Sequence, residues 1–331
     1  MNTLGRTLKR SDSKRVWEDV TSGAQAVQVR VPASTSNLGS GFDCCGLALQ
    51  LYLSVRATIK GNADEPCQVR IRGEGSESST SRPTENLIYR ARRFVAEREG
   101  LVLPPVRLAI RNDIPFASGL GSSGAAIVAG ILISAALFGR EISTDTILRY
   151  GTELEGHADN VAAALLGGLV INCIKQDGSV LAVTRRWPSD IKIIVVSPHF
   201  LVETKHARSI LPETFSRSDV IHNMQRVALF AAALESHAYD LLWDAMQDRL
   251  HQALRATLVP GLSEALATRR LPGLFGIALS GSGPSVLALA SDGFDEIGQV
   301  IANCFHKHYL KTTVRMLEVD DEGARTPVGA F

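Results

Sequence analysis

The sequence lacks the features that mark nucleic-acid-binding, secreted and membrane proteins. Its net charge is only +1, so charge does not favour a nucleic acid or an acidic membrane surface as partner. Five cysteines without CxxC or Cys/His spacing argue against structural zinc and a disulfide framework, and favour a reduced, cytoplasmic setting. The longest aliphatic run, residues 125–138, is interrupted by Ser134 and is too short to cross a bilayer.

The first residues also lack a targeting signal. They are basic but contain no apolar segment of a signal peptide, and Asp12, Glu18 and Asp19 count against a transit peptide. We therefore expect residues 1–24 to form a loosely ordered extension. There is no internal repeat or low-complexity tract, and 331 residues are enough for two domains.

Apolar periodicity predicts an α+β protein. Residues 47–60 alternate between apolar and polar side chains, as expected for a long half-buried strand, and residues 67–73 and 106–114 do the same. An early antiparallel sheet follows from these three segments. Further strands are predicted at 167–174, 180–184, 191–198, 275–280, 285–290 and 313–319, with helices at 85–99, from 121 onward, at 144–166 (as a pair), 218–235, 238–256, 261–269 and 292–308.

The polar, proline-containing segment "RRWPSD", residues 185–190, is the expected domain boundary. It divides the chain into an N-terminal domain of residues 25–187 and a C-terminal domain of residues 188–331. The order of elements suggests two α+β layers.

The segment "NDIPFASGLGSSGAAIVAG", residues 112–130, is the first candidate site. A glycine-rich turn before a helix leaves backbone N–H groups and the positive end of the helix dipole directed at one point, which suits an anion. The alternative is a turn that only caps a buried helix. The sequence contains no GxxxxGK[ST], which excludes a Walker-type phosphate loop.

Two further glycine-rich segments favour the anion-binding interpretation over a turn that only caps a helix. "PASTSNLGSGFD", residues 32–43, and "LSGSGPS", residues 279–285, each lie between two predicted strands. Three such segments, spread over both predicted domains, are more easily explained by convergence on one polyanion than by three unrelated turns.

The order of these three segments resembles the three motifs of the GHMP small-molecule kinases, over residues 26–320. Within that superfamily, "NLGSGFD", "EGHADNVAAALLGG", "ETKHARSILP" and "DRLHQALRATLVPG" together resemble the homoserine kinases. The resemblance implies a ribosomal-S5-domain-2-like N-terminal domain and a ferredoxin-like C-terminal domain. It also implies transfer of phosphate from ATP, with Mg²⁺, to the side-chain hydroxyl of L-homoserine, and a homodimer.

The resemblance also assigns residues to roles. For the nucleotide it implies Asn86, Pro115, Ser118, Gly119, Leu120, Gly121, Ser122, Ser123 and Gly124, and for the metal Ser122, Ser123 and Glu153. The substrate set is Asn37, Asp43, His157, Asn160, Thr204, Arg208 and Arg255, and the catalytic set is Ser122, Glu153 and Asn160.

Several of these roles have a physical basis and an open alternative. Glu153 and Glu155 are two residues apart, so on a helix they point to different sides and cannot both face one ion; the alignment favours Glu153. Asn160 stands where related kinases often have a catalytic aspartate. Because an amide cannot accept a proton, we expect Asn160 to orient the substrate hydroxyl. Asn86 has an N-cap role as its alternative.

Arg208 and Arg255 suit the carboxylate of an amino-acid substrate, because the guanidinium group is a planar fork of hydrogen-bond donors. Three departures from the family pattern affect loop rigidity more than charge: Ser40 and Ala158 replace usual prolines, and Gly124 replaces a usual alanine.

The rival hypotheses for the function are a GHMP kinase for another alcohol, mevalonate-like or a sugar, and a GHMP-fold sensor without turnover.

Overall fold

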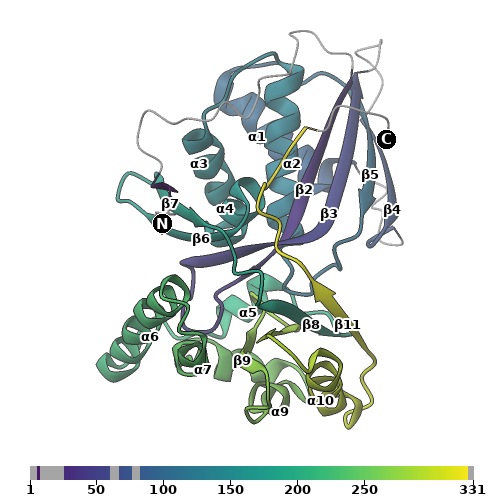
Figure 1. Cartoon of the computed structure of the whole chain (residues 1–331). Helices are drawn as coiled ribbons and strands as arrows, with labels where there is room; N and C mark the ends of the chain where they lie inside the picture. The colour runs from purple at the N-terminus through teal and green to yellow at the C-terminus, as the bar shows by residue number, and fades with distance from the viewer. Residues whose placement is uncertain (1–5, 8–25, 60–66, 77–82, 327–331) are drawn as a thin grey trace.

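Two β-sheets, one in each domain, organise the chain (Figure 1). The computed structural model describes residues 6–7, 26–59, 67–76 and 83–326. Apart from residues 6 and 7, the expected extension 1–24 lies outside the described residues. The α+β, two-domain fold predicted from the sequence is confirmed.

The N-terminal sheet is built around one long strand, β3 (Cys45–Ile59). Val55 and Ala57 are buried, and Arg56 between them is exposed, as the alternation predicts. β3 pairs antiparallel with β2, β5 and β6. The other strands of this sheet are β1 (Arg6–Thr7), β2 (Ala26–Ser36), β4 (Gln68–Gly73), β5 (Val106–Asn112), β6 (Leu169–Ile174) and β7 (Val180–Arg185).

One pairing differs from the expected antiparallel sheet, because β4 runs parallel to β5. The segment between them contains η1 (Pro83–Glu85) and α1 (Leu87–Glu99). A helical crossover of this kind returns the chain in the same direction and so gives a parallel pair. Alternation alone predicted the strands but not their relative direction.

Helices cover one face of this sheet (Figure 1). α2 (Ser122–Leu137) lies among α1, α3 (Thr144–Glu155) and α4 (Asp159–Leu166) and also contacts β2. It is buried on nearly all sides, as its aliphatic sequence predicts. The predicted helix pair within residues 144–166 is confirmed, with Gly156 as the left-handed C-cap of α3.

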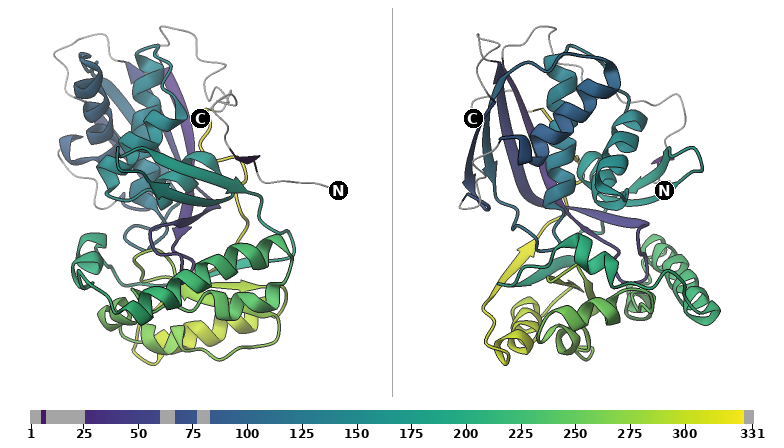
Figure 2. Two further views of the ribbon diagram at one scale, coloured as in Figure 1. Left: turned by 90° about the vertical axis from the view of Figure 1, so that its left-hand side faces the viewer. Right: turned by 180° about the vertical axis from the view of Figure 1, so that it is seen from behind.

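The C-terminal sheet has the order β11-β8-β10-β9 and is antiparallel throughout. α9 and α10 cover its face that points away from the N-terminal domain (Figures 1 and 2). Its strands are β8 (Lys192–Pro198), β9 (Leu274–Leu279), β10 (Val286–Ala290) and β11 (Thr312–Leu317). The helices of this domain are α5 (Thr204–Ser209), α6 (Arg217–Glu235), η2 (Tyr239–Leu241), α7 (Leu242–Ala245), α8 (Gln252–Arg255), η3 (Ala256–Leu258), α9 (Leu262–Leu266) and α10 (Phe294–His306). Among the described helices, none is long and apolar enough to cross a membrane.

The prediction of one continuous helix over residues 238–256 is wrong. It is divided into η2, α7 and α8. The Asp248 carboxylate accepts hydrogen bonds from the backbone N–H groups of Leu250, His251 and Gln252. An aspartate side chain that satisfies these donors favours a turn and a new helix start over helix continuation.

The chain passes from the first sheet to the second between Arg185 and Lys192, but its last described part returns. Val319 bridges Leu49, and Arg325 bridges Arg30. The buried Asp320 carboxylate accepts hydrogen bonds from Tyr52 and Arg325. Residues 319–325 therefore pack on the N-terminal domain, although the expected boundary assigned residues 188–331 to the other domain.

The three glycine-rich segments meet where the domains join. Ser34 N–H donates to Leu120 O at 3.1 Å, and Ser285 N–H donates to Ser118 O at 3.2 Å. Gly119 has φ +82°, and a Cβ there would lie 2.1 Å from Ser280 O. Only glycine permits this approach.

We expect Gly119→Ala to destabilise the protein more than Gly178→Ala. Both glycines have positive φ (+82° and +76°), but a Cβ at Gly178 would meet nothing within 4 Å. The control should lose about 1 kcal/mol from backbone strain alone. Gly119→Ala adds the clash with Ser280, so its free energy of unfolding in urea should fall by at least twice as much. Equal losses would contradict close packing of these segments.

Candidate active site

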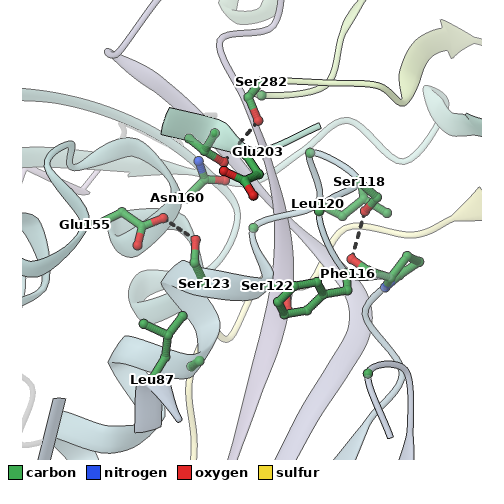
Figure 3. Close-up of a pocket in the computed structure, with 18 of the residues that line it drawn as sticks. Leu87, Phe116, Ser118, Leu120, Ser122, Ser123, Glu155, Asn160, Glu203 and Ser282 are labelled. Atoms are coloured by element: carbon green, nitrogen blue, oxygen red, sulfur yellow. Dashed lines mark hydrogen bonds between the residues drawn. The ribbon is translucent and has the colours of Figure 1, made fainter. Parts of the chain in front are cut away.

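A cavity of about 630 Å³ lies at the meeting point of the glycine-rich segments (Figure 3). Its walls also include residues of α1, β5, α5 and the α3–α4 turn. Fifteen of the predicted site residues line it: Asn37, Asp43, Asn86, Pro115, Ser118, Gly119, Leu120, Gly121, Ser122, Ser123, His157, Asn160, Thr204, Arg208 and Arg255. Gly124 and Glu153 are not among the residues that line it.

One part of the cavity is the start of α2. Gly121 is the N-cap residue and provides no side-chain hydrogen bond, so the first-turn N–H groups depend on other partners. Ser122 and Ser123 are the first two helical residues rather than caps. The start of α2 therefore presents backbone N–H groups that its N-cap residue does not cap, together with the positive end of the helix dipole, and both suit an anion.

Another part is apolar. Leu53, Ile71, Leu87, Ile110 and Phe116 line it, and Phe116 remains 55% exposed. Such walls suit a flat ring whose phosphate tail reaches α2. Asn86 lies beside them and also caps α1, since its Oδ1 accepts from the Ile88 and Tyr89 N–H groups.

The assignment of Glu153 to this site needs correction. Its side chain is 44% exposed and pairs with Arg98, outside the cavity. Glu155 instead lines the cavity with a side chain only 9% exposed, and it accepts a hydrogen bond from Ser123 Oγ (Figure 3). The two carboxylates point to different sides, as their spacing predicts, and Glu155 is the one that faces the serines.

His157 and Asp159 form a buried pair behind Glu155. The Nδ1 of His157 lies 2.6 Å from Asp159 Oδ1. Burial acts to lower the pKa of His157, but Asp159 and the charge of Glu155 outweigh it, and the net pKa is raised. Burial acts to raise the pKa of Asp159, yet His157 and the Asn160 N–H hold it below its ordinary value. The pair is therefore stabilised in its charged form.

Neighbouring hydroxyl groups fix the amide of Asn160. Ser34 Oγ donates to Asn160 Oδ1 at 2.9 Å, and Asn160 Nδ2 donates to Ser36 Oγ at 3.0 Å. A second bond from Nδ2 reaches Asp159 Oδ1 at 3.4 Å. The donor and acceptor ends of the amide thus have one defined orientation.

Asp43 and Arg208 form a bidentate ion pair, with both N···O distances 2.8 Å. Asp43 raises the pKa of Arg208. Asn37 holds the loop in place by donating to Gly281 O at 2.9 Å and accepting from the Asp43 N–H at 3.1 Å. Both Asn37 and Asp43 have positive φ, a conformation that persists only where the surroundings enforce it.

Arg255 lies beside this ion pair and is only 2% exposed. Burial, and next the charge of Arg208, lower its pKa to about 10, so the guanidinium stays charged at neutral pH. Thr204 Oγ1 lies 3.3 Å from Ser282 Oγ across the cavity rim. Two cations and one anion thus share this end of the cavity.

Sequence reasoning missed several residues of the cavity wall. Glu203 and Ser282 line it (Figure 3), as do Ser36 and Asp159. Asp159 was assigned no role from the sequence, although its position two residues after His157 was a signal for pairing. Ser40, a departure from the family pattern, donates its hydroxyl to Ala245 O at 2.7 Å and so secures the first glycine-rich segment.

Comparison with known proteins agrees with the two-domain fold. Residues 86–168 match the model of the GHMP kinases N-terminal domain, and residues 226–307 match that of the GHMP kinases C-terminal domain. The class defined by the two domains and the glycine-rich cavity is that of the GHMP kinases.

Similarity to individual relatives identifies the family within the GHMP kinases. A homoserine kinase of Deinococcus radiodurans is 42% identical over 81% of this chain and 85% of its own. One of Desulfitobacterium hafniense is 39% identical over 90% of this chain and 99% of its own. A crystal structure of homoserine kinase from Cytophaga hutchinsonii aligns with a TM-score of 0.79 and 27% identity over 93% of this chain and 99% of its own. The chain belongs to the homoserine kinase family.

Asp159→Asn tests the charged pair. Because the pKa of His157 is raised above about 6.5 and that of Asp159 is lowered, the charged pair contributes its stability between these two pKa values. The contribution is lost as pH rises through the pKa of His157 and as pH falls through the pKa of Asp159. The substitution removes the partner charge while burial remains, so the pKa of His157 should fall. An NMR titration of the imidazole measures this change. An unchanged pKa would show that Asp159 does not hold the proton on His157.

Proposed function

We propose that this protein transfers the γ-phosphate of ATP to the side-chain hydroxyl of L-homoserine, giving O-phospho-L-homoserine for threonine biosynthesis. The observation that carries the substrate assignment is the placement of Arg208, Arg255 and Asp43 at one end of the cavity. An α-amino acid presents a carboxylate and an ammonium group together. Two guanidinium groups beside one carboxylate match those charges.

The nucleotide belongs at the start of α2. The phosphates would accept hydrogen bonds from the backbone N–H groups of residues 119–123, and the helix dipole would favour their charge. The apolar wall near Leu87 and Phe116 would take the adenine ring. In this proposed arrangement the terminal phosphate would lie toward the end of the cavity that holds the arginines.

The oxygen donors at this point fit Mg²⁺, which binds one or two protein groups together with phosphates and water. Glu155 and Ser123 already contact one another there, and Ser122 is adjacent. We propose Glu155, in place of Glu153, with one of these serines as the protein ligands. The ion would neutralise charge on the transferred phosphate.

Catalysis in this proposal rests on positioning. The Oδ1 of Asn160 accepts one hydrogen bond, from Ser34, and an amide oxygen has a second lone pair for the substrate hydroxyl. No proton transfer to residue 160 is required, because the proton can leave on phosphate or water while the α2 start and neighbouring cations stabilise developing charge.

Two further parts of the proposal concern setting and assembly. All five cysteines are free thiols, which supports a reducing, cytoplasmic environment. A homodimer is expected from the family resemblance, and light scattering on the purified protein tests it.

Coupled ADP release with ATP and Mg²⁺ tests the substrate. Homoserine, mevalonate, galactose and shikimate should be compared at equal concentrations. Turnover with homoserine alone supports the proposal. Turnover with another alcohol favours a different GHMP kinase, and ATP binding without any turnover favours a sensor.

Glu155→Gln should reduce kcat by about a hundredfold or more, because it removes the charge facing Ser123. Glu153→Gln is the matched control, since Glu153 faces Arg98 outside the cavity; its kcat should stay within about twofold. Steady-state ADP release measures both. A larger loss in Glu153→Gln would restore the assignment that the alignment favoured.

Arg208→Ala should raise KM for homoserine by at least about tenfold, since it removes a charged hydrogen-bonding group from the substrate end. KM for ATP should change little. Lys205→Ala is the control, because Lys205 is exposed on the same helix, α5, and does not line the cavity. Parallel increases in both KM values would argue against a role confined to the substrate.

A further inference from the structure

His251 is a buried histidine behind the proposed substrate end of the cavity, and the assigned site does not include it. It is 1% exposed. Its ring stacks on Phe42, with 5.0 Å between centroids and 22° between planes. The guanidinium of Arg255 lies 5.2 Å from the centroid of the same Phe42 ring. His251 and Phe42 therefore lie against each other beside Arg255.

Both ring nitrogens of His251 have defined partners. Nε2 lies 2.9 Å from Gly39 O and 3.7 Å from Asp248 Oδ1. Both partners are acceptors, so the ring proton belongs on Nε2. Nδ1 lies 3.4 Å from Arg255 Nη1, and a guanidinium can only donate. Nδ1 must therefore carry no proton and act as the acceptor.

Protonation of Nδ1 would place a cation against a cation. Burial, which is the largest cause, and Arg255 lower the pKa of His251, although Asp248 opposes this shift. The neutral ring is thus consistent with the geometry. Asp248 also fixes the backbone, because its Oδ2 accepts from the N–H groups of His251 and Gln252 at 2.8 Å.

The remaining bonds of Arg255 leave one edge of its guanidinium for a ligand. Nε donates to Ala207 O and Nη1 donates to Gly281 O, both at 3.1 Å. Among the described residues, none accepts a hydrogen bond from Nη2 in the structure. Since Arg255 lines the cavity, the orientation set by its other bonds decides where Nη2 points.

We propose that His251 is a positioning residue for substrate recognition: its unprotonated Nδ1 accepts from Arg255 and fixes the guanidinium edge that receives the substrate carboxylate. The same ring joins Arg255 to Gly39 in the first glycine-rich segment, which carries Asp43. The substrate identity in this inference rests on the proposed function.

Two near-isosteric substitutions separate the two ring nitrogens. In His251→Asn the amide oxygen can occupy the place of Nδ1 and accept from Arg255, but the Gly39 contact is lost. In His251→Gln the amide can reach the place of Nε2 and donate to Gly39, but the acceptor for Arg255 is lost. We expect KM for homoserine to rise about tenfold in His251→Gln and by less than about threefold in His251→Asn.

The readouts distinguish positioning from packing. KM for ATP and kcat should stay within about twofold of the wild type in both variants, and their melting temperatures should be similar. Equal increases in KM for homoserine in the two variants would overturn the proposal. So would an increase in KM for ATP that parallels the one for homoserine.

A spectroscopic measurement tests the inference without turnover. In the wild-type protein, ¹⁵N NMR of histidine-labelled sample should show His251, assigned by its absence from the spectrum of His251→Asn, as neutral with the proton on Nε2 at pH 7. The opposite tautomer or an imidazolium would overturn the inference even if homoserine is the substrate. If the wild type failed to phosphorylate homoserine but showed the expected tautomer, the proposed function would fail while the contact to Arg255 stood.

Discussion

The site depends on the direct backbone packing of three glycine-rich segments that are far apart in the sequence. A Cβ on Gly121 would lie 2.1 Å from Ser34 Oγ, and one on Gly119 would lie 2.1 Å from Ser280 O. Because no side chain separates them, the segments hold one another in place through backbone hydrogen bonds. Each segment carries residues of the cavity wall, so the cavity and the junction of the two domains are one structure.

The charges of the cavity explain why an amino acid suits it. Asp43 and Arg208 neutralise one another, and Arg255 is a buried cation that makes no hydrogen bond to a described carboxylate. A buried, incompletely paired cation is costly. In the proposed complex, a substrate carboxylate would supply the missing anion and its ammonium group would give Asp43 a second cationic partner. Binding would therefore complete the charge balance of this end of the cavity.

The sequence predicted more of this site than of the connections around it. Alternation identified β3, because the period of apolar residues is a local property of the sequence. The three glycine-rich segments were expected to converge because one polyanion explains all three. The parallel pairing of β4 could not be predicted, since direction depends on the path of α1 across the sheet. Glu153 was favoured over Glu155 because alignment does not show which side of the last turn of α3 faces Ser123. His251 was overlooked because its position beside the cavity depends on packing against Phe42 and Gly39, which are distant in sequence.

The surroundings of Asn160 explain why an amide, rather than a carboxylate, stands at this position. Its Nδ2 group donates to Ser36 Oγ and Asp159 Oδ1, bonds that a carboxylate could not make. Asp159 is buried and held in its charged form by His157. A second carboxylate at residue 160 would place two like charges together with little solvent to screen them. The fold that stabilises Asp159 therefore disfavours a second carboxylate at residue 160, and the proposed reaction relies on orientation and charge neutralisation instead.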